Sequence, residues 1–144
     1  MTGLDASAAG RRGEDLAKWV WPSLRFVRLA SAEDRRGIDA YEENIPTQVK
    51  YDVRISESDQ IYHELYEKTK GHPEQCWRPS PHQAQQFIFV TEGWAARIPV
   101  DVLAQLVVRK QVTQISGTSI GVLIPRRELM PFTEVQIFEW EGQA

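Results

Sequence analysis

Two short β-forming runs joined by a turn place the strongest constraint on how this 144-residue chain folds. Residues 38–41 and 47–53 are rich in β-branched and aromatic side chains, and Glu42-Glu43-Asn44 follows the first run. β-formers on both sides of a few turn-forming residues predict an antiparallel hairpin. The pairing of the two runs then decides which of their side chains lie close together.

The hairpin gathers an acid, an amide and a lysine. Alternate side chains of a strand share a face, so Gln48 and Lys50 point together while Val49 points into the core. Asp39 joins them when the two runs pair. Oxygen ligands suit a hard cation such as Mg²⁺, and a positive group beside an attacking water suits phosphodiester hydrolysis. The spacing makes this part of the hairpin the candidate active site.

The rest of the chain alternates between helical and strand patterns. Apolar spacing and capping residues predict helices over residues 5–21, 59–69 and 101–110. Strands or extended pieces are expected over residues 24–29, 86–91, 95–99, 119–124 and 134–140, with a polar turn over 31–37 and a proline-rich loop over 71–81. This order predicts an α/β fold in which a mixed sheet carries helices on its faces.

Length and composition limit the classes of protein that fit. A chain of 144 residues, 42% hydrophobic and 26% charged, is expected to form one globular domain over residues 1–144. The net charge of -3 argues against a protein that coats DNA through bulk positive potential. The N-terminus lacks the pattern of a signal peptide, and no apolar run approaches the ~20 residues of a membrane span. With Cys76 as the single cysteine, we expect a cytoplasmic location and no membrane partner.

The order of these motifs resembles a known family. A helix with Glu14, a strand, the turn Gly37-Ile38-Asp39 and a strand with Gln48-Val49-Lys50 look like the PD-(D/E)XK nuclease superfamily. Glutamine in place of the usual second acid is similar to the Mrr-type restriction endonucleases. The resemblance covers residues 10–52, with residues 86–91 fitting the central sheet. It implies a restriction-endonuclease-like mixed central sheet flanked by helices, in a metal-dependent DNA endonuclease of repair, recombination or defence.

The resemblance also implies a role for each site residue. Asp39, Gln48, Lys50 and Glu14 take the catalytic positions, and Mg²⁺ or Mn²⁺ would lie on Asp39, Gln48, the Val49 carbonyl and Glu14. A bound water of lowered pKa would attack the phosphodiester, with Lys50 orienting it or stabilising the transition state. The family's proline before the aspartate is Ile38 here. Gln48 stands where the family has a second acid, so the metal site has one negative charge fewer and Glu14 has to supply it.

Basic and aromatic side chains are candidates for DNA contacts. Arg11, Arg35 and Arg36 flank the elements that carry the site, and Trp77-Arg78 lies in the proline-rich loop. The plainer alternatives are solvated surface pairs, and a Trp77 that closes the core. A domain this small covers few base pairs, so a homodimer that cuts both strands is a reasonable expectation.

Other interpretations stay open. The same fold could be a catalytically inactive binding module or partner subunit, and RNA or a small phosphodiester could be the substrate. A zinc site would draw on the following four residues, whose spacing matches no standard finger: His63, His72, Cys76 and His82. A hydrolase triad of Ser80, His82 and Asp101 lacks the strand-to-helix turn that would expose the nucleophile.

Overall fold

The structure is a computed structural model in which the following residues are described: 3–29, 31–51, 59–68, 77–80, 82–110, 114–116, 119–131 and 134–137. The helices are α1 (Gly3–Val20), α2 (Ala32–Arg35), α4 (Val100–Val108) and α5 (Arg126–Leu129). The strands are β1 (Leu24–Phe26), β2 (Ala40–Glu42), β3 (Ile45–Tyr51), β4 (Gln60–Lys68), β5 (Trp77–Pro79), β6 (Gln86–Val90), β7 (Trp94–Pro99), β8 (Gln114–Ser116), β9 (Ser119–Pro125) and β10 (Glu134–Ile137).

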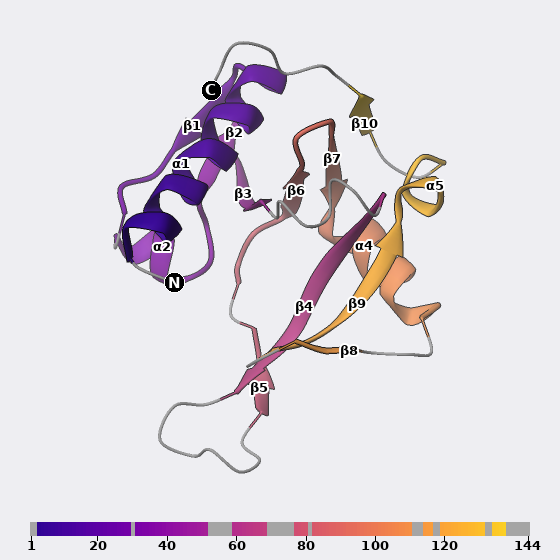
Figure 1. Cartoon of the computed structure of the whole chain (residues 1–144). Helices are drawn as coiled ribbons and strands as arrows, with labels where there is room; N and C mark the ends of the chain where they lie inside the picture. Colours follow the sequence, from indigo (N-terminus) through magenta and orange to yellow (C-terminus); the bar gives the residue numbers. More distant parts are fainter. Residues whose placement is uncertain are drawn as a thin grey trace.

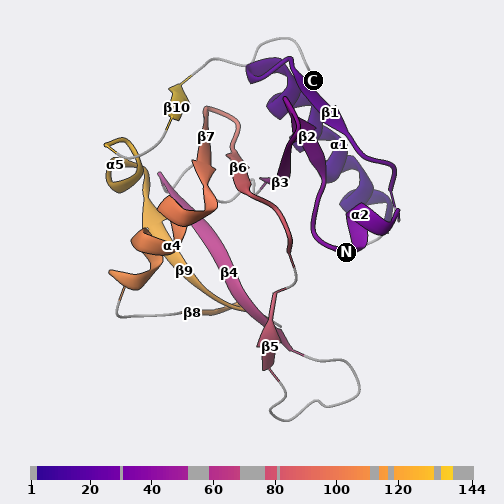
Figure 2. The ribbon, with the colours of Figure 1, turned by 180° about the vertical axis from the view of Figure 1, so that it is seen from behind.

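The strands form two sheets. A six-stranded sheet has the order β1-β2-β3-β6-β7-β10, and a four-stranded sheet has the order β5-β4-β9-β8. In the first sheet β3 and β6 run parallel while the other neighbours are antiparallel, so this sheet is mixed. The chain is therefore a mixed α/β protein, with α1 beside β1–β3 and the long β4–β9 ribbon at the other side of the molecule (Figures 1 and 2).

Helix α1 covers one face of the six-stranded sheet. Leu16 and Ala17 are fully buried and pack in one cluster with Ile88 and Val90 of β6. Gly13 lets the helix approach β3 closely, because a Cβ at this position would lie 2.5 Å from the Cβ of Tyr51. The face of the sheet that carries Val49 and Tyr51 is thus closed by the helix.

The opposite face of β6 and β7 is covered by the second sheet together with α4. Phe87 and Phe89 of β6 stack with their ring centroids 5.8 Å apart. They share a buried cluster with Ile61 of β4, Val122 of β9 and Leu103 of α4. Gln48 and Lys50 pair in register with these two phenylalanines, so they lie on this face, at its margin toward β2.

The predicted hairpin is confirmed. Ala40 pairs with Thr47 and Glu42 with Ile45, which leaves a two-residue turn. Its residues Glu43 and Asn44 have φ of 48° and 72°, the left-handed pair that a type I′ turn requires. Asparagine tolerates this conformation, and the turn therefore sets the register of the strand that carries the candidate site.

The helix predicted over residues 59–69 is wrong, because Gln60–Lys68 is strand β4. The apolar positions Ile61, Tyr62, Leu65 and Tyr66 fit helical spacing. The segment nevertheless pairs with β9 from Gln60 to Glu67, with one register shift between Glu64 and Tyr66. Long-range pairing thus overrides a local pattern that β-branched and aromatic residues satisfy equally well. Asp59, the expected helix cap, has φ 61° and forms an ion pair with Arg126.

Three smaller expectations also change. The polar turn over 31–37 contains α2, the strand expected over 24–29 ends at Phe26, and the loop over 71–81 contains β5. Residues 52–53 and 138–140 of two expected strands lie outside the described residues. Within the part of the chain that the structure describes, no helix is both long and apolar enough to span a membrane.

Candidate active site

A short helix and its caps position Asp39. The Ser31 side chain accepts a hydrogen bond from the N–H of Asp34 and begins α2. The helix ends with Gly37 at φ 79°, where the N–H of Gly37 bonds to the carbonyl of Asp34 and that of Ile38 to Glu33. These bonds form a Schellman motif, which requires a residue free to adopt positive φ. Gly37 therefore turns the chain so that Asp39 enters β2 at a defined place.

Asp39 is held between two strands. Its N–H donates to the carbonyl of Thr47 (2.8 Å), and its carbonyl accepts from the N–H of Val27 (2.9 Å). The carboxylate Oδ2 accepts a hydrogen bond from the N–H of Val49 (2.8 Å). The N–H and carbonyl of one strand residue point to the same side, so the Val49 carbonyl faces the Asp39 side as well. The structure thus brings an acid and a main-chain oxygen together.

Gln48 and Lys50 project beside this acid. Gln48 is 9% exposed, and its side-chain amide has no hydrogen-bond partner among the described residues. The positive charge of Lys50 lowers the pKa of Asp39, while burial, which is the larger effect, raises it. The structure therefore brings Lys50 near Asp39 and places Gln48 on the same face of β3 as Lys50.

Two further acids share the electrostatic environment of Asp39. Partial desolvation raises the pKa of Glu14 on α1, and the negative charges of Asp39, Asp15 and Asp34 raise it further. Asp34 also raises the pKa of Asp39. The predicted Glu14 therefore lies near the site, and Asp34 is an acid that the sequence pattern did not single out, because its proximity depends on how α2 folds back.

This donor set fits a hard divalent cation. Asp39 and Glu14 could supply carboxylates, and Gln48 and Val49 could supply neutral oxygens. A cation would offset the burial, which is the larger effect, and the repulsion between acids that together raise the pKa of Asp39 and Glu14. Among the residues described, no three His, Cys, Asp or Glu side chains form a metal-ligating group. Two carboxylates with two neutral oxygens would accordingly hold the metal weakly, in the way that suits Mg²⁺ or Mn²⁺ at millimolar concentrations.

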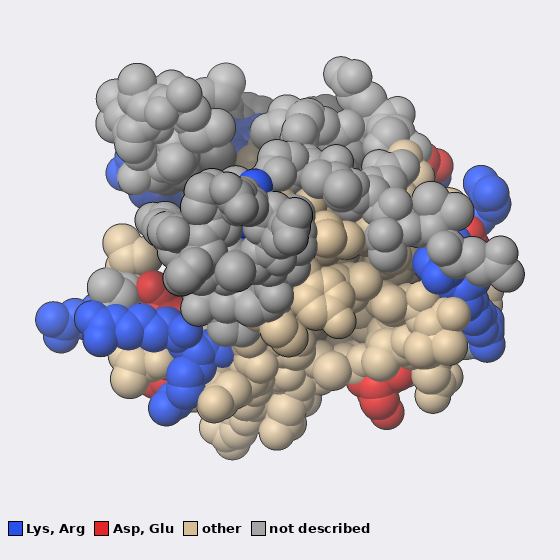
Figure 3. Space-filling model, turned by 90° about the horizontal axis from the view of Figure 1, so that it is seen from below, with Lys and Arg blue, Asp and Glu red and all other residues tan. Residues whose placement is uncertain are grey.

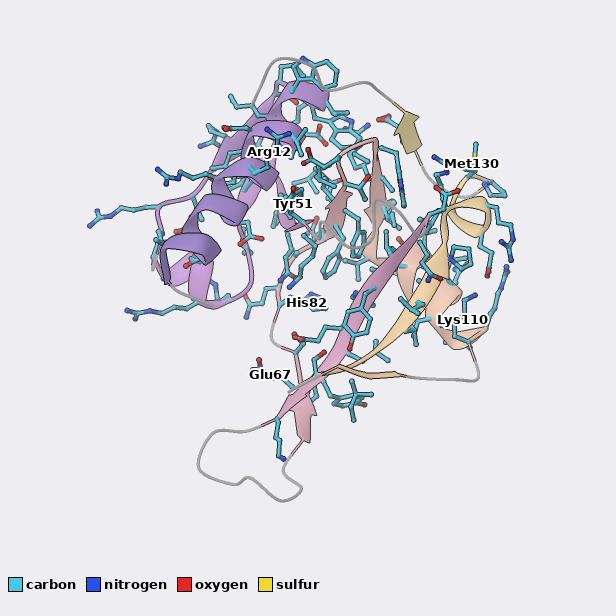
Figure 4. All side chains as sticks on the ribbon, in the orientation of Figure 1. Arg12, Tyr51, Glu67, His82, Lys110 and Met130 are labelled. Atoms are coloured by element: carbon cyan, nitrogen blue, oxygen red, sulfur yellow. The ribbon has the colours of Figure 1, made fainter. Side chains whose placement is uncertain are left out.

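Two histidines lie on the other side of Lys50. The rings of His63 on β4 and His82 both meet Phe87 edge-on, with centroids 5.1 Å apart in each case. His82 lies between β3, which carries Tyr51, and β4 (Figure 4). Burial, together with the smaller effects of His82 and Lys50, lowers the pKa of His63 to about 4. Partial burial and the charge of Lys50 also lower the pKa of His82.

The buried His63 gives the fold a pH-dependent stability. Between about pH 6.5 and pH 4 the unfolded chain binds a proton at this histidine that the folded chain does not, so stability falls as the pH is lowered. The quantity to compare is the free energy of unfolding of the wild type minus that of His63→Gln. As the pH is lowered from about 6.5 to about 4, this difference should fall by about 2–3 kcal/mol. Urea unfolding of the wild type and of His63→Gln at several pH values measures this difference. A pH-independent difference would contradict a neutral buried His63.

The remaining predicted residues divide into two groups. Arg11, Arg35 and Arg36 are exposed, and the carbonyl of Arg36 accepts a hydrogen bond from the N–H of Gln83 (2.8 Å), beside His82. The backbone of Trp77 and Arg78 pairs with Lys68 and Glu67. The side chains of Trp77 and Arg78 lie outside the described residues, so their expected DNA contacts stay predictions.

The alternative metal and triad interpretations receive no support from the geometry. His72 and Cys76 of the zinc interpretation lie outside the described residues. Ser80 donates to Glu64 (2.7 Å), and Asp101 accepts from the N–H of Val102 (3.0 Å). The side chains of Ser80 and Asp101 are thus bonded to Glu64 and to the first turn of α4, and not to His82.

Comparison with known proteins adds no family. No protein-family model, no curated protein and no solved structure matches this chain. The function is accordingly inferred from Asp39, Val49 and Lys50 and the groups around them.

Proposed function

We propose that this chain is a Mg²⁺- or Mn²⁺-dependent deoxyribonuclease with a restriction-endonuclease-like fold. The observation that carries the proposal is the hydrogen bond from the Val49 N–H to the Asp39 carboxylate (2.8 Å). The bond holds the Asp39 carboxylate against the main chain of Val49, and Lys50 is the next residue of β3. The side-chain amide of Gln48, which precedes Val49, has no partner among the residues that the structure describes. The mixed sheet with α1 on one face is compatible with that fold.

The proposed roles follow from the charge of each group. Asp39, Gln48, the Val49 carbonyl and Glu14 would hold the cation, which when bound lowers the pKa of a water ligand and offsets phosphate charge. Lys50 would stabilise the negative charge that develops on the phosphate oxygens. The hydrogen bond from Val49 fixes the direction of the Asp39 carboxylate, so less reorganisation accompanies metal binding.

The proposal is tested by incubating the purified protein with plasmid and branched DNA in Mg²⁺, in Mn²⁺ and in EDTA. Metal-dependent cleavage that EDTA abolishes and that Lys50→Ala loses is the expected result. Cleavage in EDTA, or an undiminished rate in Lys50→Ala, would contradict the site. Gel filtration with and without DNA would show whether two chains act together on both strands.

One observation favours a second candidate, a non-catalytic binding module. Gln48 stands where a second carboxylate would strengthen metal binding, and it is neutral. Calorimetric titration with Mn²⁺ separates the two candidates: heat of binding at millimolar metal supports the nuclease, and its absence supports the module. Gln48→Glu should increase the affinity for metal if the side chain faces the ion.

A further inference from the structure

An open groove of about 510 Å³ lies on the β1–β2 side of the candidate site. Its volume is in the range of small-molecule sites, about 300–1,000 Å³. The side chains and backbone that line it include Arg25, Val27, Arg28, Glu33, Tyr41 and Asn44. None of them belongs to the proposed metal site.

The groove shares a face of the six-stranded sheet with Gln48 and Lys50. Ala40 faces α1 in the buried cluster of that helix, so Tyr41, its neighbour along β2, points to the opposite face. Arg25 is the register partner of Tyr41 and points the same way. Val49 likewise packs on the α1 side, which leaves Gln48 and Lys50 on the face of Tyr41.

Two of the lining residues are hydrogen-bonded to Asp39 or to its neighbour in the chain. The N–H of Val27, one of the lining residues, donates to the carbonyl of Asp39 (2.9 Å). The N–H of Ile38 donates to the carbonyl of Glu33, which lines the groove from α2 (3.0 Å). The groove is therefore next to Asp39, so a strand whose phosphodiester lies at Asp39 is close to the groove.

The chemistry of the groove suits a nucleic-acid strand. Arg25 and Arg28 are exposed and have no ion-pair partner among the described residues, and Glu33 is the one acid that lines it. The Arg25 guanidinium lies over the Tyr41 ring, 5.8 Å from its centroid. Guanidinium groups bind phosphates, and aromatic rings stack on bases. Figure 3 shows Lys and Arg side chains projecting at the side where α1 and α2 lie and also at the opposite side.

We propose that this groove binds the DNA strand next to the cleaved phosphodiester, with Arg25 and Arg28 on phosphates and Tyr41 against a base. The proposal rests on the nuclease function proposed above. It goes beyond that function because it assigns the substrate path to β1 and β2. The sequence analysis instead favoured the neighbouring arginines Arg35 and Arg36 for DNA contacts.

The test measures binding of a fluorescent single-stranded oligonucleotide by anisotropy, in EDTA so that no cleavage occurs. The double variant R25A/R28A should bind about tenfold more weakly at ~0.1 M salt, and the slope of log Kd against log salt should fall by about 1.5, as expected for two lost phosphate contacts. Tyr41→Leu should weaken binding with an unchanged slope. The matched control is Arg127→Ala, an exposed arginine on α5, which should bind as the wild type does.

The outcomes separate the groove from the proposed function. If the wild type cleaves DNA but R25A/R28A has the same Kd and salt slope as the wild type, the groove proposal is wrong and the proposed nuclease function stands. A wild type that neither binds nor cleaves DNA overturns both. Circular dichroism and the Tm of each variant establish folding, and R25K/R28K, which keeps both charges, should retain the slope. If R25K/R28K loses the slope as R25A/R28A does, the phosphate contacts are excluded.

Discussion

Replacing Asp39 with asparagine is expected to reduce metal-dependent DNA cleavage by at least about 100-fold in kcat/KM. Asparagine keeps the shape of the side chain and an oxygen that can accept the hydrogen bond from Val49. It removes only the negative charge that would bind the cation. Calorimetry with Mn²⁺ provides a second readout, since metal binding should weaken in parallel with activity.

The fold should survive this substitution. Burial raises the pKa of Asp39, which means that the folded environment disfavours its charged form. Neutral asparagine at this position should therefore leave the Tm unchanged or slightly higher. The matched control is Asp15→Asn, which removes a charge near Glu14 without touching the proposed ligands. If Asp39→Asn cleaves within threefold of the wild-type rate, Asp39 is not a metal ligand.

Replacing Arg97 with methionine is expected to destabilise the fold by about 3 kcal/mol, because it leaves a buried carboxylate without its partner. Glu42 is only 4% exposed. Arg97 Nη1 donates to both of its carboxylate oxygens at 2.6 Å, and Nη2 donates to Glu134 at 2.8 Å. The guanidinium also lies over the ring of Trp21, 5.4 Å from its centroid.

The remaining donors to Glu42 do not replace this charge. Gln86 Nε2 donates to Glu42 Oε1 (3.1 Å) and Ser23 Oγ to Oε2 (3.4 Å), but both groups are neutral. The double variant E42Q/R97M should consequently be more stable than Arg97→Met alone, since no charge is then left buried.

Urea unfolding of the three variants measures these differences. Lys110→Met serves as the comparison, because it breaks the Lys110–Glu128 ion pair (2.6 Å), whose members are 20% and 38% exposed. It should cost less than about 1 kcal/mol. Equal losses in Arg97→Met and Lys110→Met would show that the Glu42 pair behaves as a surface ion pair.

The contrast between β3 and β4 explains which elements could be predicted. β3 belongs to a hairpin whose turn residues and β-formers are adjacent in the chain, so its register follows from local chemistry. β4 pairs with β5 and β9, and its apolar residues satisfy helical spacing as well as strand pairing. Only pairing with the partner strands distinguishes a strand from a helix here, and the periodicity of one segment carries no information about its partners.

The candidate site divides in the same way. Asp39 meets Val49 ten residues later in one hairpin, so short-range geometry was enough to bring the acid to the strand that carries Gln48 and Lys50. Asp34 comes near Asp39 because α2 ends in a Schellman motif at Gly37. Gly37 marks the end of the helix in the sequence, but the sequence does not show in which direction the chain continues.

Local propensity and turn chemistry thus decide the hairpin, helix α1 and the grouping of Asp39 with Lys50, because these depend on residues close together in the chain. Long-range packing decides the rest. The strand conformation of β4, the position of His63 and the partnership of Glu42 with Arg97 all require segments distant in sequence to meet. The free energy of such contacts comes from burial and pairing that exist only in the assembled fold, so no local pattern could specify them.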